Sequence, residues 1–263
     1  MKVTCIQMDM MFANPDKNFE KAGILIFQAA KEGADTIVLP ETWNTGFFPK
    51  ENLAGLSDKN GSRTKEVFSA LAESLDVNIV AGSVANKKDG GVYNTAYVFN
   101  RKGECVAEYD KTHLFSPMDE DKYFKKGDHV CTFELDGIRC GLIICYDVRF
   151  PELTRTMTVK GVDILFMVSQ WPLVRVAHLD ALTKARAIEN QMFMVCCNSA
   201  GKAGETVYGG NSSITDPWGN VIAHAKGSEE EFVTADCNTN ILSDIRNSIN
   251  VFRDRRPELY NVN

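Results

Sequence analysis

An alternation of short apolar segments with amphipathic helical segments runs through most of this chain and constrains its fold more than any other feature. The apolar segments are typical of buried strands and lie at residues 3–10, 36–40, 78–84, 162–168 and 192–199. The helical segments lie at residues 15–32, 63–75, 151–161 and 177–190. Asn14 and Pro15 predict the start of the first helix, as N-cap and first helical residue, and Gly33 predicts its end.

Hairpins interrupt this alternation twice. The first interruption has turns at residues 89–91 and 101–104, followed by a hairpin around Asp136-Gly137. The second, over residues 208–237, is predicted to be another meander. Helices and strands in these numbers suggest an α/β fold of two facing sheets with helices outside, although the pattern alone does not separate this from an open doubly wound sheet. Because no linker or repeat divides the chain, residues 1–263 are interpreted as a single domain.

Charge and composition narrow the class of protein. The net charge of −6 argues against a nucleic acid or an anionic membrane as partner, although one local Arg or Lys could still bind a small anionic substrate. No apolar stretch approaches the roughly 18 residues of a membrane helix. The start of the chain has no signal-peptide pattern, so we expect a cytoplasmic protein.

The cysteines and histidines do not form a metal-binding pattern. None of the eight cysteines belongs to a Cys-x-x-Cys pair, and the four histidines have no partner at ligand spacing, so we expect no metal and no cofactor. Most of these thiols are expected to be small buried hydrophobic groups. Cys196 and Cys197 could form a redox pair, but they lie in a strand-like segment and are more simply strand residues.

Cys145 has a different context, because it lies between the apolar run 142–144 and the helix that begins at Pro151. A nucleophilic cysteine needs a group that lowers the pKa of its thiol or accepts its proton. A helix N-terminus or a lysine favours the thiolate, and a carboxylate can act as the base. Cys145 is therefore a candidate nucleophile.

Two charged residues also follow predicted strands. Glu41 comes directly after the run 36–40, and Lys111 follows the strand-like segment 105–110. Taken alone, Glu41 could cap a helix and Lys111 could be a solvated surface residue. If they converged with Cys145, the three would suit acyl transfer from an amide: thiolate attack, an oxyanion stabilised by the lysine, and a carboxylate that moves the proton.

The segments VLPETW, EYDKTHLF and GLIICYDVRFPEL, in this order, resemble the motifs of the nitrilase (carbon–nitrogen hydrolase) superfamily. The resemblance covers nearly the whole chain and implies a four-layer α-β-β-α sandwich with a catalytic triad of Glu41, Lys111 and Cys145. It also implies a second glutamate, assigned to Glu120, although Asp119 and Asp121 flank it. Resembling enzymes dimerise through helices, which makes the helix at Pro151 and residues 252–260 a candidate interface of a homodimer.

Within the superfamily, CYDVRFPEL and VFRDRRPELY resemble the omega-amidase branch, whose members hydrolyse the terminal amide of 2-oxoglutaramate and 2-oxosuccinamate. Tyr146 and Asp147, where nitrilases usually have Trp-Glu, favour amide over nitrile chemistry. Substrate-binding candidates are Tyr146, Arg149, Trp171 and Arg175, with either arginine as the carboxylate binder. The alternatives are an amidase for deaminated glutathione or an N-carbamoyl compound, and a non-catalytic binding protein on the same fold.

Overall fold

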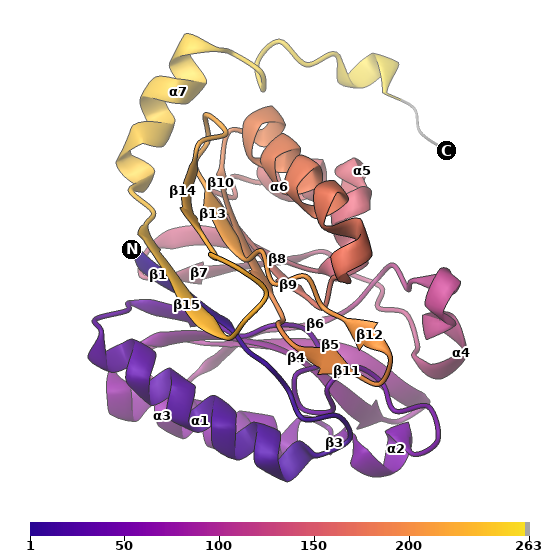
Figure 1. Cartoon of the computed structure of the whole chain (residues 1–263). Coiled ribbons are helices and arrows are strands. Elements are labelled where there is room, and N and C mark those ends of the chain that lie inside the picture. The colour runs from indigo at the N-terminus through magenta and orange to yellow at the C-terminus, as the bar shows by residue number, and fades with distance from the viewer. Residues whose placement is uncertain (261–263) are drawn as a thin grey trace.

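Two β-sheets lie face to face between two layers of helices in the computed structural model, which describes residues 1–260 (Figure 1). The first sheet has the strands β1 (Lys2–Gln7), β2 (Thr36–Val38), β3 (Asp58–Lys59), β4 (Asn78–Lys88), β5 (Gly91–Phe99), β6 (Cys105–Asp110) and β15 (Glu231–Asp236). The second has β7 (Cys131–Leu135), β8 (Ile138–Ile144), β9 (Ile164–Ser169), β10 (Phe193–Asn198), β13 (Ser213–Thr215) and β14 (Val221–His224). A small separate hairpin pairs β11 (Lys202–Ala203) with β12 (Thr206–Val207).

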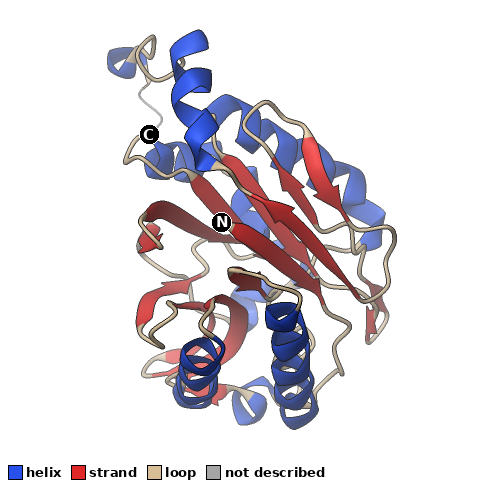
Figure 2. Ribbon diagram, turned by 90° about the vertical axis from the view of Figure 1, so that its left-hand side faces the viewer, coloured by secondary structure: helices blue, strands red, loops and turns tan. Residues whose placement is uncertain are grey.

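Helices complete the structure, and the longer ones cover the outer faces of the two sheets, as Figure 2 shows from the side. The helices are α1 (Pro15–Lys31), α2 (Leu53–Leu56), α3 (Ser62–Leu75), α4 (Glu120–Tyr123), α5 (Pro151–Thr158), α6 (Val176–Asn190) and α7 (Leu242–Ser248). The helices α1 and α3 pack on the first sheet, and α5 and α6 pack on the second. The structure confirms the predicted four-layer α-β-β-α sandwich.

Alternating side chains divide the core into three layers. Along β9, Ile164, Phe166 and Val168 enter the cluster between the sheets, whereas Leu165 and Met167 pack against the helices outside. Successive residues of a strand point to opposite faces, so a strand that is apolar throughout serves two cores at once. The continuous apolar runs of the sequence therefore mark strands buried on both faces.

Local signals in the sequence account for several element boundaries. The side chain of Asn14 accepts a hydrogen bond from the backbone N–H of Lys17, and Pro15 opens α1, as predicted. Asp136 and Gly137 both have positive φ, at 50° and 77°, which is the conformation of a tight hairpin turn between β7 and β8.

The predicted second meander is wrong in its last strand. The strands β13 and β14 pair within the second sheet, but β15 crosses to the first sheet and pairs antiparallel with β1 over six residue pairs, from Lys2 with Asp236 to Gln7 with Glu231. Local strand patterns do not specify which sheet edge a strand joins, because both edges offer unpaired backbone groups.

None of the helices between residues 1 and 260 combines the length and the apolar composition that a membrane-spanning segment requires.

Candidate active site

One pocket lies where segments from both sheets meet, and it contains every site residue predicted from the sequence. Its volume is about 400 Å³, including its open mouth. It is lined by the predicted residues Glu41, Lys111, Glu120, Cys145, Tyr146, Arg149, Trp171 and Arg175, and by Phe47, Phe115, Met118, Gln170 and Pro172. Glu41 and Lys111 follow β2 and β6 of the first sheet, whereas Cys145 and Trp171 follow β8 and β9 of the second. The site is thus assembled across the interface between the sheets.

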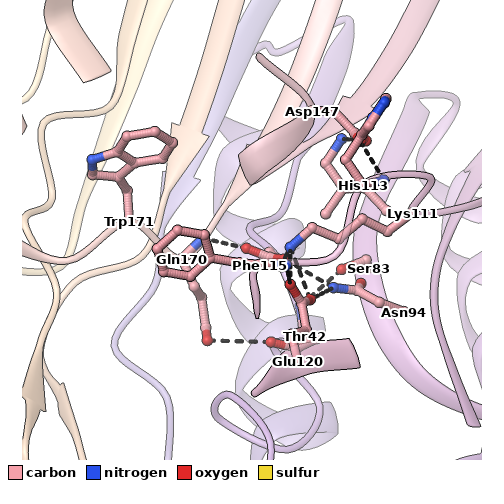
Figure 3. Close-up of polar contacts among 12 residues, drawn as sticks. Thr42, Ser83, Asn94, Lys111, His113, Phe115, Glu120, Asp147, Gln170 and Trp171 are labelled. Atoms are coloured by element: carbon pink, nitrogen blue, oxygen red, sulfur yellow. Dashed lines mark hydrogen bonds and ion pairs between the residues drawn. The ribbon is translucent and has the colours of Figure 1, made fainter. Parts of the chain in front are cut away.

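Lys111 lies between two buried carboxylates. Its Nζ is 2.7 Å from Oε1 of Glu41 and 2.8 and 2.9 Å from the two oxygens of Glu120 (Figure 3). Only 2% of Lys111 and 3% of Glu120 is exposed to solvent. Of the three acidic candidates at residues 119–121, Glu120 is the one that enters the pocket; the Asp119 carboxylate instead pairs with Lys50 and Lys122 at the surface.

The charges of this cluster depend on one another. Burial alone would lower the pKa of Lys111, but the carboxylates of Glu120 and Glu41 raise it well above its ordinary value, so the ammonium stays charged. Burial raises the pKa of Glu120, with a further contribution from the charge of Glu41, while Lys111 opposes both. A single cation therefore holds two carboxylates in one low-dielectric site.

Glu41 is fixed by three donors. Besides Lys111, it accepts hydrogen bonds from the side-chain amide of Asn94 at 2.8 Å and from the backbone N–H of Gln170 at 2.9 Å. Asn94 also lies 3.4 Å from Oε1 of Glu120, so it connects the two carboxylates. Asn94 was not predicted as a site residue. Its signal in the sequence is an asparagine in the middle of a strand of aromatic and β-branched residues, where it is disfavoured unless it has buried partners.

Cys145 occupies a sharp bend between strand and helix. Its φ is +47°, in the left-handed region that a non-glycine residue adopts at a cost of about 1–3 kcal/mol. It begins the 3₁₀ turn Cys145–Arg149, which leads into α5 at Pro151. This bend directs the thiol into the pocket at the end of β8.

The surroundings of Cys145 raise the pKa of its thiol. Burial raises its pKa well above the ordinary value, and the charge of Glu41 raises it further, against the opposing charge of Lys111. Lys111 therefore lowers the pKa of the thiol, as expected, but burial and Glu41 outweigh it. The carboxylate of Glu41 lines the same pocket as the thiol, which makes it the candidate for the base expected from the sequence.

Aromatic rings and two guanidinium groups form the mouth of the pocket. The guanidinium of Arg149 stacks 4.8 Å from the ring centre of Trp171, and that of Arg175 lies 5.0 Å from the ring centre of Phe115. The indole N–H of Trp171 donates to the backbone oxygen of Arg175 at 2.7 Å. This hydrogen bond links the Arg149–Trp171 pair to the Arg175–Phe115 pair. The structure brings both arginines to the pocket.

The other candidate groups are placed elsewhere. Cys196 and Cys197 are both fully buried in β10 and point to opposite sides of the second sheet. They are strand residues, as the simpler interpretation predicted. In the part of the chain that the structure describes, no three His, Cys, Asp or Glu side chains are grouped so that they could hold a metal ion.

Comparisons with known proteins identify the family. Residues 2–247 match the sequence model of the carbon–nitrogen hydrolase family, and the chain belongs to that family. It is 42% identical over 258 residues to a 2-oxoglutaramate amidase of Bacillus subtilis (strain 168), with 98% of each chain covered. It is 33% identical over 275 residues to omega-amidase NIT2 of Pongo abelii, covering 99% of this chain and 97% of that one.

A solved structure supports the same assignment. Nit3 of Saccharomyces cerevisiae, described as a member of branch 10 of the nitrilase superfamily, superimposes with a TM-score of 0.90 at 26% sequence identity. The superposition covers 97% of this chain and 96% of that chain. The family and the fold therefore agree with the resemblance found in the sequence.

Proposed function

We propose that this protein hydrolyses the terminal amide of a small 2-oxo dicarboxylic acid monoamide, with 2-oxoglutaramate as the main substrate and 2-oxosuccinamate as a second. The observation that carries the proposal is one pocket that combines a buried Glu-Lys-Glu cluster and a cysteine with two arginines at its mouth. The 42% identity to a 2-oxoglutaramate amidase over nearly the whole chain supports it.

The reaction begins with proton transfer from the thiol of Cys145 to the carboxylate of Glu41, because the raised pKa of the thiol requires a base. The sulfur attacks the amide carbonyl, and the negative charge moves to the carbonyl oxygen. The Lys111 ammonium and a backbone N–H at the bend stabilise this oxyanion. Glu41 then gives its proton to the amide nitrogen, the C–N bond breaks, and ammonia leaves a thioester on Cys145.

Hydrolysis of the thioester uses the same groups in the reverse sense. Glu41 accepts a proton from water, whose oxygen attacks the thioester carbonyl, with Lys111 again beside the oxyanion. Collapse of the tetrahedral adduct releases the carboxylic acid and returns the proton to the sulfur. In this scheme Glu120 holds Lys111 charged and in place, which is consistent with its two contacts of 2.8 and 2.9 Å.

Specificity follows from the charges at the mouth. Arg149 or Arg175 can pair with the substrate carboxylate through two parallel N–H···O bonds, while Tyr146 and Trp171 enclose the carbon chain. A neutral amide would leave the guanidinium without its ionic partner, so it should bind less well.

The remaining parts of the proposal concern the domain organisation, the cellular location and the oligomeric state. We propose one carbon–nitrogen hydrolase domain over residues 1–263, a cytoplasmic location and a homodimer. The proposed interface contains α5 and residues 252–260, which carry exposed apolar side chains including Leu259 and Tyr260. A C2 dimer would bury this patch twice. Light scattering at micromolar concentration tests it, and a fully active monomer would contradict it.

The function is tested by ammonia release from 2-oxoglutaramate, 2-oxosuccinamate, glutamine, asparagine, a carbamoyl amino acid, deaminated glutathione, propionamide and an aliphatic nitrile. We expect the highest kcat/KM for 2-oxoglutaramate. Equal hydrolysis of propionamide or the nitrile would refute the omega-amidase assignment and leave a broader family amidase. A preference for deaminated glutathione or the carbamoyl compound would support those alternative substrates, and no turnover of any compound would favour the non-catalytic binder.

The substrate anchor is tested by Arg149→Ala and Arg175→Ala. One of them should raise KM for 2-oxoglutaramate and leave the slow turnover of propionamide unchanged. Arg63→Ala is the matched control, since Arg63 also stacks on an aromatic ring, that of Phe19 at 4.1 Å, but lies outside the pocket. If neither pocket variant changes KM more than this control, the carboxylate is not bound by these arginines.

A further inference from the structure

A further buried carboxylate, outside the pocket lining, connects the segments that carry Lys111 and Cys145. Asp147 lies two residues after Cys145 and is fully buried. One of its oxygens, Oδ2, accepts a hydrogen bond from the backbone N–H of Ile144 at 3.0 Å. Asp147 therefore closes the bend from both sides of the nucleophile, which holds Cys145 in its left-handed conformation.

The remaining donors to Asp147 flank Lys111. The Tyr109 hydroxyl donates to Oδ2 at 2.8 Å, and the Thr112 hydroxyl donates to Oδ1 at 3.1 Å. His113 adds its backbone N–H at 3.0 Å and its ring Nδ1 at 2.8 Å, both to Oδ1 (Figure 3). Residues on both sides of Lys111 in the sequence thus donate hydrogen bonds to the carboxylate of Asp147.

The hydrogen bonds of Asp147 join the two sheets next to Lys111 and Cys145. Lys111 follows β6 of the first sheet and Cys145 follows β8 of the second, so nothing along the chain fixes the distance between them. Five hydrogen bonds converge on Asp147, four from the lysine segment and one from the cysteine segment. Hydrogen bonds to an ionised group are stronger than those between neutral groups, and a buried charge without them would be costly.

Two further contacts keep the connection rigid. The ring of His113 stacks on that of Phe150 with centres 3.7 Å apart, and Phe150 donates its backbone N–H to the carbonyl oxygen of Asp147 at 3.0 Å. Burial and the charge of Asp147 raise the pKa of Tyr109 far above its ordinary value, so its hydroxyl remains a donor.

We infer that Asp147 is a positioning residue that fixes the ammonium of Lys111 relative to the thiol of Cys145. It does not touch the substrate and acts through its hold on both segments. The inference rests on the proposed roles of Lys111 and Cys145. Small errors of placement are costly in such a site, since a shift of about 1 Å can reduce the rate about 10²-fold.

The test removes two of the four donors of the lysine segment while preserving shape. Thr112→Val replaces a hydroxyl by a methyl group, and His113→Phe keeps a ring that can stack on Phe150. Thr64→Val is the matched control, because the Thr64 hydroxyl donates to the buried carboxylate of Asp58 at 2.6 Å, away from the site. Each protein is measured for kcat, KM, melting temperature and the rate at which iodoacetamide alkylates Cys145, followed by peptide mass spectrometry.

We expect the double variant Thr112→Val/His113→Phe to lower both kcat and the alkylation rate about 10-fold or more, with KM within about threefold of wild type. Asp147→Asn should lower both about 10²-fold. Thr64→Val should lower the melting temperature but neither rate. If the double variant or Asp147→Asn does not fold, kcat and the alkylation rate of the single variants Thr112→Val and His113→Phe are compared with those of Thr64→Val instead.

The inference is overturned if the variants around Asp147 lose melting temperature like Thr64→Val and retain wild-type kcat and alkylation, because Asp147 would then serve stability alone. The alkylation rate does not depend on the substrate. If wild type fails to hydrolyse 2-oxoglutaramate but the variants still alkylate more slowly, the proposed function fails and the positioning role stands.

Discussion

Replacing Glu120 by Gln tests the charge arrangement of the site with the least change of shape. Glu120 accepts from Lys111 through both oxygens and from the backbone N–H of Phe115 at 2.6 Å. A glutamine has one acceptor oxygen, so its NH₂ group faces the Lys111 ammonium in either orientation, and in one of them it also faces the Phe115 N–H. One buried donor is then left without an acceptor.

The contacts of Glu120 set the expected loss of melting temperature and the expected loss of kcat. An unsatisfied buried donor costs about 1–3 kcal/mol, and for a chain of this size each kcal/mol lowers the melting temperature by roughly 2–4 °C. We therefore expect a loss of about 2–12 °C. Lys111 keeps Glu41 as its partner, so the protein should fold, but a displaced ammonium should lower kcat about 10²-fold.

The assay is steady-state ammonia release together with thermal unfolding, with Asp119→Asn as the control. Asp119 has a left-handed backbone, with φ of 63°, which asparagine tolerates, and its carboxylate pairs with Lys50 and Lys122 at the surface. Asp119→Asn should leave kcat unchanged. Wild-type kcat in Glu120→Gln, or an equal loss in Asp119→Asn, would refute the assignment of the second glutamate and the argument from buried charge.

Three other predictions follow from the same structure. Cys145→Ala should fold and show no turnover, and Cys145→Ser should be nearly inactive; more than a few per cent of wild-type activity in the alanine variant would exclude the thioester route. Because burial and Glu41 raise the pKa of Cys145 above its ordinary value of about 9, its alkylation by iodoacetamide should still be increasing above pH 9, whereas a plateau below pH 8 would contradict the raised pKa. Asn14→Ala should cost about 1 kcal/mol in urea unfolding through loss of the α1 cap, without changing kcat, and no change in the unfolding midpoint would show that this cap is unimportant.

The sequence predicted those pocket residues that lie directly after a predicted strand and within a family motif. Glu41, Lys111 and Cys145 each follow a strand, where functional groups concentrate, and the family motifs surround them. Asn94 and Asp147 were not assigned roles, because their importance depends on partners from other segments, which residue spacing does not reveal. Both candidate arginines reach the same pocket, so residue spacing did not select between them.

For the fold as well, features set by neighbouring residues were predicted from the sequence, whereas those set by distant residues were not. The N-cap of α1 and the turn at Asp136-Gly137 depend on neighbouring residues and were predicted correctly. The crossing of β15 to the first sheet was not, because its sequence is equally suited to another strand of a meander. Likewise, the thiol of Cys145 has a helix start and a lysine nearby, yet burial outweighs both in setting its pKa.

The pairing of β1 with β15 also has a consequence for biosynthesis. Gln7 pairs with Glu231, so one edge of the first sheet has no partner strand until residue 231 and its neighbours have been translated. At about 5–20 residues per second, that interval lasts roughly 10–45 s. During this time β1 presents unpaired backbone groups that another nascent chain could occupy. The nascent chain therefore lacks the pairing that closes this edge in the finished protein.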